Sequence, residues 1–172
     1  VHFFENELCR YLFSSHSDRQ PILLIDVRPK EQFRMLHLSQ GALLSALERR
    51  GRPEWVAALT GQRSQARVII ANITLREIKQ ECRRKGSGSH SDSDAWFRVA
   101  AMATRIERQS ILGLESATMA KVEAASVQSV FLLCRRGVDS AAAAGVLLQA
   151  GAPNVVNISG GLDAWRSQVD PN

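Results

Sequence analysis

Short apolar runs recur along the chain between longer stretches of mixed polarity. The runs at 22–25 and 130–133 consist of aliphatic and aromatic residues alone, which is typical of strands buried on both faces of a parallel sheet. Residues 155–158 form a similar run, and the weaker runs at 42–44 and 68–70 predict two more short strands. The apolar pattern therefore predicts a sheet of short, buried strands.

Amphipathic stretches separate these runs. Residues 3–13 place apolar side chains at helical spacing, and Cys9 fits among them as a small hydrophobic residue. A second helix is predicted to begin at Pro29, with Phe33 and Leu36 on its inner side.

Three further helices are predicted in the second half of the chain. Residues 95–122 are rich in Ala, Met, Glu and Arg, and residues 140–149 form an Ala- and Leu-rich stretch closed by Gly151. A short helix that follows residues 160–161 carries Trp165 as a core residue. Because strands alternate with helices, we expect an α/β fold in which helices flank a parallel sheet on both faces.

The middle of the chain departs from this alternation. Residues 49–108 hold 13 Lys or Arg and six Asp or Glu, a net charge of +7, whereas the whole chain carries +5. Within this stretch, the charged, Gly- and Ser-rich composition of residues 81–94 predicts a flexible loop, above all at 86–94. We interpret residues 50–129 as a long basic insertion in a single domain that spans residues 1–172.

A basic stretch of this kind can bind nucleic acid or an acidic protein, or it can form a solvated surface. Aromatic side chains that could stack on bases are scarce within it: Trp55, Trp96 and Phe97. We therefore favour a solvated surface and expect no nucleic-acid partner.

The composition excludes several classes of protein. Hydrophobic residues make up 45% of the 172 residues and charged residues 23%, so neither a disordered nor a fibrous chain is expected. No apolar run approaches the roughly 18 to 20 residues of a membrane span, so no membrane association is expected. Cys9, Cys82 and Cys134 are widely spaced, with no CxxC pair or histidine cluster beside them, which argues against disulfides and a metal site.

The same cysteine usage favours a reducing compartment, and we expect a cytoplasmic protein. The first residues lack the basic and apolar regions of a signal peptide, and Val1 is not a start methionine. We interpret the chain as a fragment of a longer protein.

Cys134 is the residue most suggestive of chemistry. It follows a buried run, at the carboxyl end of a predicted parallel strand, where α/β sheets gather their functional groups. The residues that lead from it into the next helix are Arg135, Arg136, Gly137, Val138, Asp139 and Ser140. Backbone N–H groups of such a loop, the helix dipole and the two arginine charges would stabilise a thiolate or persulfide anion. We therefore predict that Cys134 is an acidic nucleophile and that residues 135–140 form its substrate-binding loop.

Three separated motifs resemble the rhodanese-type sulfurtransferases. Residues 134–140 resemble the active-site loop of that family, and Asp-Val-Arg at 26–28, continued by 31–38, is similar to its first-strand signature. Residues 160–165 resemble the Gly-Gly-x-x-x-Trp segment that closes the family's domain. The resemblance implies a rhodanese-like fold and an enzyme that carries sulfur as a persulfide on Cys134.

A finer resemblance rests on residues 29–33, 137–140 and 168–172. These segments are similar to the C-terminal rhodanese domain of the ubiquitin-like-modifier activating enzymes, also called molybdopterin synthase sulfurylases. That family joins an adenylating domain, which uses ATP and zinc, to a rhodanese domain that needs no cofactor of its own.

This finer resemblance also implies partners. The persulfide donor would be a protein such as a cysteine desulfurase, and the acceptor an adenylated ubiquitin-like sulfur-carrier protein. The carrier's thiocarboxylate would then serve tRNA thiolation, molybdenum cofactor synthesis, or both. Val138 stands where Asn is common in the activating enzymes and resembles the thiosulfate rhodaneses instead.

Other functions stay open at this point. The chain could be a stand-alone thiosulfate or mercaptopyruvate sulfurtransferase, or a rhodanese-like interaction module without catalysis. Phosphatases of the related Cdc25 type need an arginine six residues after the cysteine to hold phosphate with two hydrogen bonds. Ser140 occupies that position here, which disfavours a phosphatase.

Asp26 and Arg28 are supporting candidates, because they end a strand close to the predicted loop. They could pin neighbouring backbone or pair with Glu31, or they could form a purely structural ion pair. We expect His37 to form structural hydrogen bonds. For Cys82 we expect an exposed, flexible setting, a slightly lowered pKa and no catalytic role.

Overall fold

The structure is a computed structural model, and it describes residues 22–38, 68–84, 93–112, 127 and 129–168. Predicted elements that fall on other residues, the helix at 3–13 and the strand at 42–44, lie outside this description, and so does Cys9. The predicted flexible tract at 86–94 also lies outside it, except for its last two residues, which belong to a helix.

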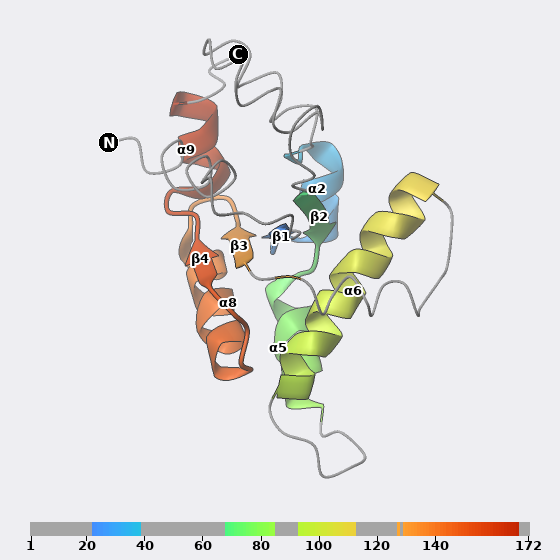
Figure 1. Cartoon of the computed structure of the whole chain (residues 1–172). Coiled ribbons are helices and arrows are strands. Elements are labelled where there is room, and N and C mark those ends of the chain that lie inside the picture. The colour runs from blue at the N-terminus through green and yellow to red at the C-terminus, as the bar shows by residue number, and fades with distance from the viewer. Residues whose placement is uncertain (1–21, 39–67, 85–92, 113–126, 128, 169–172) are drawn as a thin grey trace, which may run out of the picture.

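Four parallel strands form the described sheet (Figure 1). They are β1 (Ile22–Asp26), β2 (Val68–Asn72), β3 (Ser129–Leu133) and β4 (Val155–Asn157), in the spatial order β2-β1-β3-β4. All residues of β1 and β3 are buried. Their continuous apolar runs therefore match a sheet that is covered on both faces. The expected α/β fold with a parallel sheet is thus confirmed.

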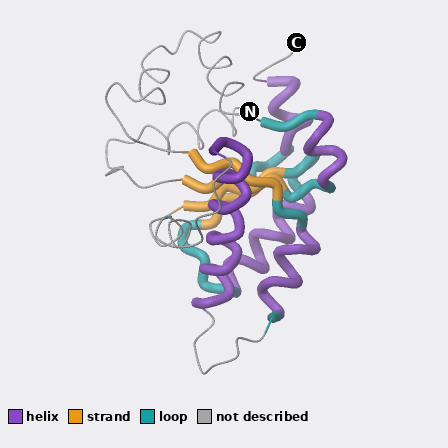
Figure 2. The backbone as a smooth tube through the Cα atoms, turned by 90° about the vertical axis from the view of Figure 1, so that its right-hand side faces the viewer, coloured by secondary structure: helices purple, strands orange, loops and turns teal. Residues whose placement is uncertain are grey.

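Three helices cover one face of the sheet. They are α5 (Leu75–Arg83), α6 (Ser93–Leu112) and α8 (Val138–Gln149). In Figure 1, α5 and α8 stand below the row of strands, and α6 rises from beside α5 toward the upper right. The turned view of Figure 2 shows the strands as one layer, with most of the helical segments below it. The core between them contains, among other residues, Leu23, Ile25, Ile69, Val130, Leu132, Ile78, Trp96, Val99 and Leu147.

Two shorter helices, α2 (Lys30–Met35) and α9 (Gly161–Gln168), lie on the opposite side of the strands in Figure 1. From α9, Leu162 and Trp165 are each 8% exposed, so the prediction that Trp165 is a core residue is confirmed. Helices therefore flank both faces of the sheet, as expected.

One prediction about α2 was wrong. The helix begins after Pro29 and has no buried residue, and Leu36, which follows it, is 60% exposed. Leu36 has an extended backbone rather than a helical one, with φ −155° and ψ 123°. Because the helix ends a residue earlier than the apolar spacing suggested, the side chain of Leu36 is not carried onto an inner face.

The loop predicted at 81–94 was also wrong at both of its ends. Helix α5 continues to Arg83, and α6 already begins at Ser93. Cys82 is therefore a half-buried residue of α5 that packs against the core, in contrast to the exposed, flexible setting expected for it.

Sequence signals for α5 exist, although the sequence analysis missed them. Thr74 and Glu77 form a capping box, in which the Thr74 hydroxyl accepts from the Glu77 N–H and the Glu77 carboxylate accepts from the Thr74 N–H. Leu75, Ile78 and Cys82 follow at helical spacing. These three residues form a narrow apolar face, and the many charged residues around it led to the prediction of a loop.

Much of the stretch interpreted as a basic insertion belongs to the described fold. Strand β2 is an outer strand among the four described ones, paired with β1, and α5 and α6 cover one face of the sheet. The extent of the insertion, 50–129, and the single domain over 1–172 stay predictions.

Candidate active site

Cys134 lies directly after β3, at the carboxyl end of the sheet. The residue is 2% exposed, and its neighbour Leu133 accepts a hydrogen bond from the N–H of Val27 at 2.8 Å. The first-strand motif and the cysteine loop therefore begin side by side, because β1 and β3 are paired in register.

The sulfur of Cys134 accepts hydrogen bonds from its own loop. The N–H of Gly137 lies 3.0 Å from Sγ, and the Ser140 hydroxyl lies 3.2 Å from it. Both donors are buried, so water does not compete freely for the sulfur. The N–H nest predicted around Cys134 is present, and Ser140 adds a side-chain donor to it.

Opposing effects set the pKa of the Cys134 thiol. Burial raises it, because a thiolate is poorly solvated in the interior. Hydrogen bonds from the Ser140 hydroxyl and from backbone N–H groups of Ser140, Arg136 and Gly137 lower it. The donors together outweigh burial, so the pKa lies below the usual thiol value. A lowered pKa enriches the thiolate, which is the nucleophilic form.

Gly137 lets the loop turn into helix α8. It is the N-cap of that helix, in the left-handed region with φ +90°. A Cβ at this position would lie 2.8 Å from the backbone nitrogen of Gly160, so a larger residue would have both a strained backbone and a collision. The glycine thereby allows its own N–H to point at the sulfur.

The other loop residues lie toward solvent. Arg135, Arg136, Val138 and Asp139 are all exposed, and the Nε of Arg135 lies 3.5 Å from the carboxylate of Asp163. The largest effects that lower the pKa of Cys134 are hydrogen bonds from the Ser140 hydroxyl and from backbone N–H groups. Arg136 contributes its backbone N–H to the sulfur, and an effect of the two side-chain charges stays a prediction.

Helix α9 closes the loop from the other side. The N–H groups of Leu162 and Asp163 donate to the carbonyl oxygens of Cys134 and Arg135, each at 3.0 Å. A Cβ on Gly161 would overlap the carbonyl oxygen of Cys134, so this approach requires a glycine. The sequence motif at 160–165 was recognised as a resemblance, but its role as the clamp on the cysteine loop was not foreseen.

Asn157 is a further residue that the sequence analysis missed. Its Nδ2 donates to the carbonyl oxygen of Gly137 at 3.2 Å, which fixes the peptide next to the one that donates to the sulfur. Within the described part of the chain, its buried Oδ1 has no hydrogen-bond partner. A polar residue inside an otherwise apolar strand was the signal that could have identified it.

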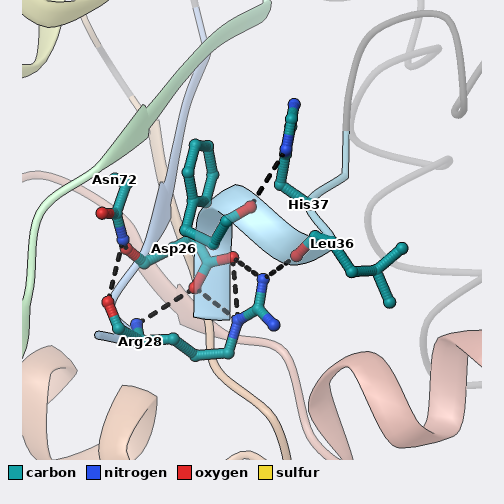
Figure 3. A network of polar contacts seen from close by, with 6 residues as sticks. Asp26, Arg28, Leu36, His37 and Asn72 are labelled. Carbon is teal, nitrogen blue, oxygen red and sulfur yellow. Dashed lines mark hydrogen bonds and ion pairs between the residues drawn. The ribbon is translucent and has the colours of Figure 1, made fainter. Parts of the chain in front are cut away.

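Asp26 and Arg28 form a buried network beside the site (Figure 3). The Asp26 carboxylate accepts from the backbone N–H of Arg28 at 3.0 Å and from its Nη2 at 2.7 Å. The same Nη2 donates to the carbonyl oxygen of Leu36 at 2.6 Å. Arg28 thus pairs with Asp26, rather than with Glu31, and it also pins the backbone after α2.

Two neighbours extend this network. The Asn72 amide donates to the carbonyl oxygens of Asp26 and Arg28, both at 2.9 Å, and so ties β2 to the end of β1. His37 Nδ1 lies 3.1 Å from the carbonyl oxygen of Phe33, and the two rings stack (Figure 3). Such contacts fit the structural role expected for His37.

The thiol of Cys82 differs from the expectation. Burial, with a smaller contribution from Glu81, raises its pKa, and the nearby Arg98 charge does not compensate. The slightly lowered pKa expected for Cys82 was therefore wrong, because the cysteine packs against the core instead of standing in solvent.

Two other observations concern ligands and membranes. Across the described ranges, no three His, Cys, Asp or Glu side chains gather as a metal site would require. Among the helices of the same ranges, none combines the length and the apolar character of a membrane span.

Comparison with known proteins agrees with the fold. Residues 101–168 match the family model of the rhodanese-like domain. These residues thus resemble the rhodanese-like domain, and the match supports a sulfurtransferase of the rhodanese type. The family resemblance read from the sequence is confirmed.

A particular relative is "Adenylyltransferase and sulfurtransferase MOCS3" of Arabidopsis thaliana, to which the chain is 39% identical over 75 residues. Those residues are 43% of this chain and 16% of the relative, so the match spans a small part of that protein's length. No solved structure matches the chain.

Proposed function

We propose that Cys134 carries sulfur as a persulfide and passes it to an adenylated ubiquitin-like sulfur-carrier protein. The observation that carries this proposal is the buried sulfur of Cys134, which accepts hydrogen bonds from Gly137 and Ser140 and has a lowered pKa. Residues 135–140 serve as the loop that receives the substrate sulfur, and Asp26 and Arg28 hold the neighbouring backbone.

Loading of the site is a thiol exchange. The Cys134 thiolate attacks the outer sulfur of a donor persulfide, a new S–S bond forms on Cys134, and the donor leaves as a thiolate. We propose a protein donor of the cysteine desulfurase type. Before the attack, the negative charge lies on the Sγ of Cys134, where the hydrogen bonds from Gly137 and Ser140 stabilise it.

Unloading transfers the outer sulfur to the carrier. The terminal sulfur of the persulfide attacks the carbonyl carbon of the carrier's acyl-adenylate, and AMP leaves with the bonding electrons. A first external thiol attacks the Sγ of Cys134, which breaks the S–S bond, releases the carrier thiocarboxylate and leaves a mixed disulfide on Cys134. A second external thiol attacks that mixed disulfide, which returns Cys134 to the thiolate and joins the two external thiols as a disulfide. The thiocarboxylate would supply tRNA thiolation, molybdenum cofactor synthesis, or both, in the cytoplasm.

Two observations support a protein partner over a small anion. The relative from Arabidopsis thaliana is named for both adenylyl transfer and sulfur transfer. The loop also presents the Asp139 carboxylate and the 70% exposed side chain of Val138 to solvent. A carboxylate repels a dianion such as thiosulfate, whereas an exposed apolar side chain suits contact with a protein.

The direct test is mass spectrometry after incubation with a persulfide donor. We expect one additional sulfur atom on Cys134 and its loss in Cys134→Ser. Cys82→Ser is the matched control and should keep the adduct, because the Cys82 thiol lacks the donors of the loop. A sulfur adduct and sulfur transfer that persist in Cys134→Ser would refute the assignment.

A second test separates the protein-partner function from a stand-alone thiosulfate enzyme. Asp139→Thr should raise kcat/KM for thiosulfate, measured as thiocyanate formation, by about ten-fold, because one repelling charge is removed. Glu31→Thr, which removes an exposed carboxylate from α2, is the control and should have little effect. High thiosulfate turnover in the wild type, unchanged by Asp139→Thr, would favour the stand-alone enzyme.

A further inference from the structure

A cavity of about 820 Å³ opens beside the cysteine loop, and no step of the proposed chemistry uses it. Helix α5 forms most of its wall, and Val27 and Asp139 line its other sides. Val27 donates its N–H to Leu133, the residue before Cys134, and Asp139 lies in the first turn of α8, just after Gly137. The cavity therefore begins where the cysteine loop ends.

The wall of this cavity is strongly basic. Arg76, Lys79, Arg83 and Arg84 line it, and Asp139 is the one carboxylate among the described lining residues. Within the described part of the chain, Arg76, Lys79 and Arg83 have no carboxylate partner, whereas Arg84 pairs with Glu81 at 3.2 Å.

The carboxylates of α5 do not neutralise the wall. The Glu77 carboxylate lies 2.7 Å from the Lys30 ammonium, and Glu81 is shared by Arg84 and Arg98. Among the described lining residues, four cations thus face the cavity against the single carboxylate of Asp139. Such a surface attracts anionic groups and raises their local concentration.

We propose that this cavity binds an acidic polypeptide segment of the protein that exchanges sulfur with Cys134. This inference rests on the proposed function, because a segment held here would bring its own protein to the loop. The cations from Arg76 to Arg84 extend over about 12 Å of helix at 1.5 Å per residue. An extended peptide rises about 3.3 Å per residue, so about four of its residues would lie along the row.

The arrangement favours a peptide over other anions. A single phosphate needs donors that converge on one point, whereas these cations follow one another along a helix. A single-stranded nucleic acid would gain from stacking on aromatic rings, and none of the described lining residues is aromatic.

The test uses the whole 172-residue chain and a fluorescein-labelled octapeptide of alternating Glu and Gly as the probe. Fluorescence anisotropy should give an affinity that falls with salt. The double variant Arg76→Glu/Arg83→Glu should weaken binding about ten-fold or more. Both side chains are exposed, so the change should leave the fold intact, which circular dichroism checks.

The matched control is Arg105→Glu/Arg166→Glu, which makes the same change in net charge at exposed arginines of α6 and α9. Because these residues lie outside the cavity, the affinity should change less than two-fold, by the screening of distant charges. Equal weakening by both double variants would overturn the inference, since it would reveal non-specific attraction. Tighter, cavity-dependent binding of an octauridylate RNA would overturn it as well and assign the cavity to nucleic acid.

A separate measurement keeps this inference distinct from the proposed function. Alkylation of Cys134 by iodoacetamide, which is uncharged, should proceed at the same rate in the cavity variants and the wild type. A normal sulfur adduct on Cys134 with no cavity-dependent peptide binding would refute the cavity alone. Absence of the adduct from the wild type would refute the proposed function, whatever the cavity binds.

Discussion

Cys134 shows how hydrogen-bond donors can lower the pKa of a buried thiol. Burial favours its neutral form, and the balance is reversed by hydrogen bonds from Gly137, Ser140 and their neighbours. Hydrogen bonds to charged groups contribute about 1.5 to 3 kcal/mol, more than those between neutral groups. Removing one donor should therefore have a measurable effect on the charge of the sulfur.

We predict that Ser140→Ala raises the pKa of the Cys134 thiol by about one pH unit, which corresponds to about 1.4 kcal/mol. The rate of alkylation by iodoacetamide should rise with pH in both proteins, and the variant should reach the same rate at a higher pH. Ser167→Ala is the control, because the Ser167 hydroxyl donates to Ala164 in α9 instead. An unshifted pH profile would show that the hydroxyl does not stabilise the thiolate.

At the scale of elements, the site depends on the close contact between the cysteine loop and the start of α9. Gly160 and Gly161 both have positive φ, +78° and +55°. A Cβ on Gly161 would meet the backbone of Cys134 and Arg135, whereas a Cβ on Gly145, within α8, would meet nothing. Gly161 and Gly145 therefore make a matched pair for substitution by alanine.

Gly161→Ala should lower the free energy of unfolding by about 2 to 3 kcal/mol, through overpacking and a strained backbone. It should also slow the alkylation of Cys134, because the loop carbonyls lose their donors. Gly145→Ala should instead raise the free energy of unfolding by about 0.5 to 1 kcal/mol, since alanine favours a helix interior. Urea titrations measure both values, and a Gly161→Ala protein as stable as the wild type would contradict the close contact.

Helix α5 is stabilised by contacts of Glu77 in its first turn. The carboxylate of Glu77 accepts hydrogen bonds from Thr74 and lies beside Lys30. Partial burial raises its pKa, but the contacts with Lys30 and Thr74 outweigh this and lower the pKa below 4.5.

The lowered pKa of Glu77 gives a pH dependence of stability. A carboxyl group whose pKa is lower in the folded state stabilises the fold above its unfolded pKa and loses this contribution as pH falls through the folded value. We therefore predict that Glu77→Gln costs about 0.5 to 1 kcal/mol near pH 7, and that this cost shrinks below about pH 4.5. Urea unfolding at pH 7, 5 and 3.5 measures it, and Glu31→Gln on α2 should cost little at any pH.

The elements that could be read from the sequence are those whose pattern is local. The apolar runs at 22–25 and 130–133 predicted β1 and β3 correctly, because both faces of these strands are buried. Helix α5 was missed because its capping box and narrow apolar face stand among many charges. The exposed Leu36 was assigned inward because a six-residue helix offers too few positions to fix its face.

The candidate site was predictable to a similar degree. The position of Cys134 after a buried strand indicated the N–H donors that the structure places around its sulfur. The clamp by α9 and the contact of Asn157 with Gly137 join residues far apart in the chain, so spacing within one segment could not reveal them. The outward direction of Arg135 and Arg136 depends on the course of the loop in three dimensions.

At the scale of the whole molecule, the ion pair of Asp26 and Arg28 connects separate parts of the fold. Its side chains are 3% and 8% exposed, and the Arg28 guanidinium also donates to Leu36 in the chain after α2. The backbone carbonyl oxygen of Asp26 accepts from the Asn72 amide, which links β1 to β2. A buried pair of this kind is costly to break on one side, because the remaining charge is left without a partner.

Asp26→Asn should therefore lower the free energy of unfolding by about 3 to 5 kcal/mol. The control is Asp163→Asn, which breaks the exposed pair with Arg135 and should cost less than about 1 kcal/mol. Chemical denaturation of both variants gives the comparison. Similar, small losses in the two proteins would show that water screens the Asp26 pair as well.

The clamp by α9 has a consequence for the order in which the protein becomes active during synthesis. Cys134 leaves the ribosome before Gly161, Leu162 and Asp163, whose backbone groups hold the cysteine loop. Chains are made at roughly 5 to 20 residues per second and fold as their segments emerge, so a nascent chain carries its thiol for about a few seconds before the clamp exists. During that interval the donors at Gly137 and Ser140 are already part of the chain, but the carbonyl groups of Cys134 and Arg135 still lack the N–H groups of α9 that hold the loop.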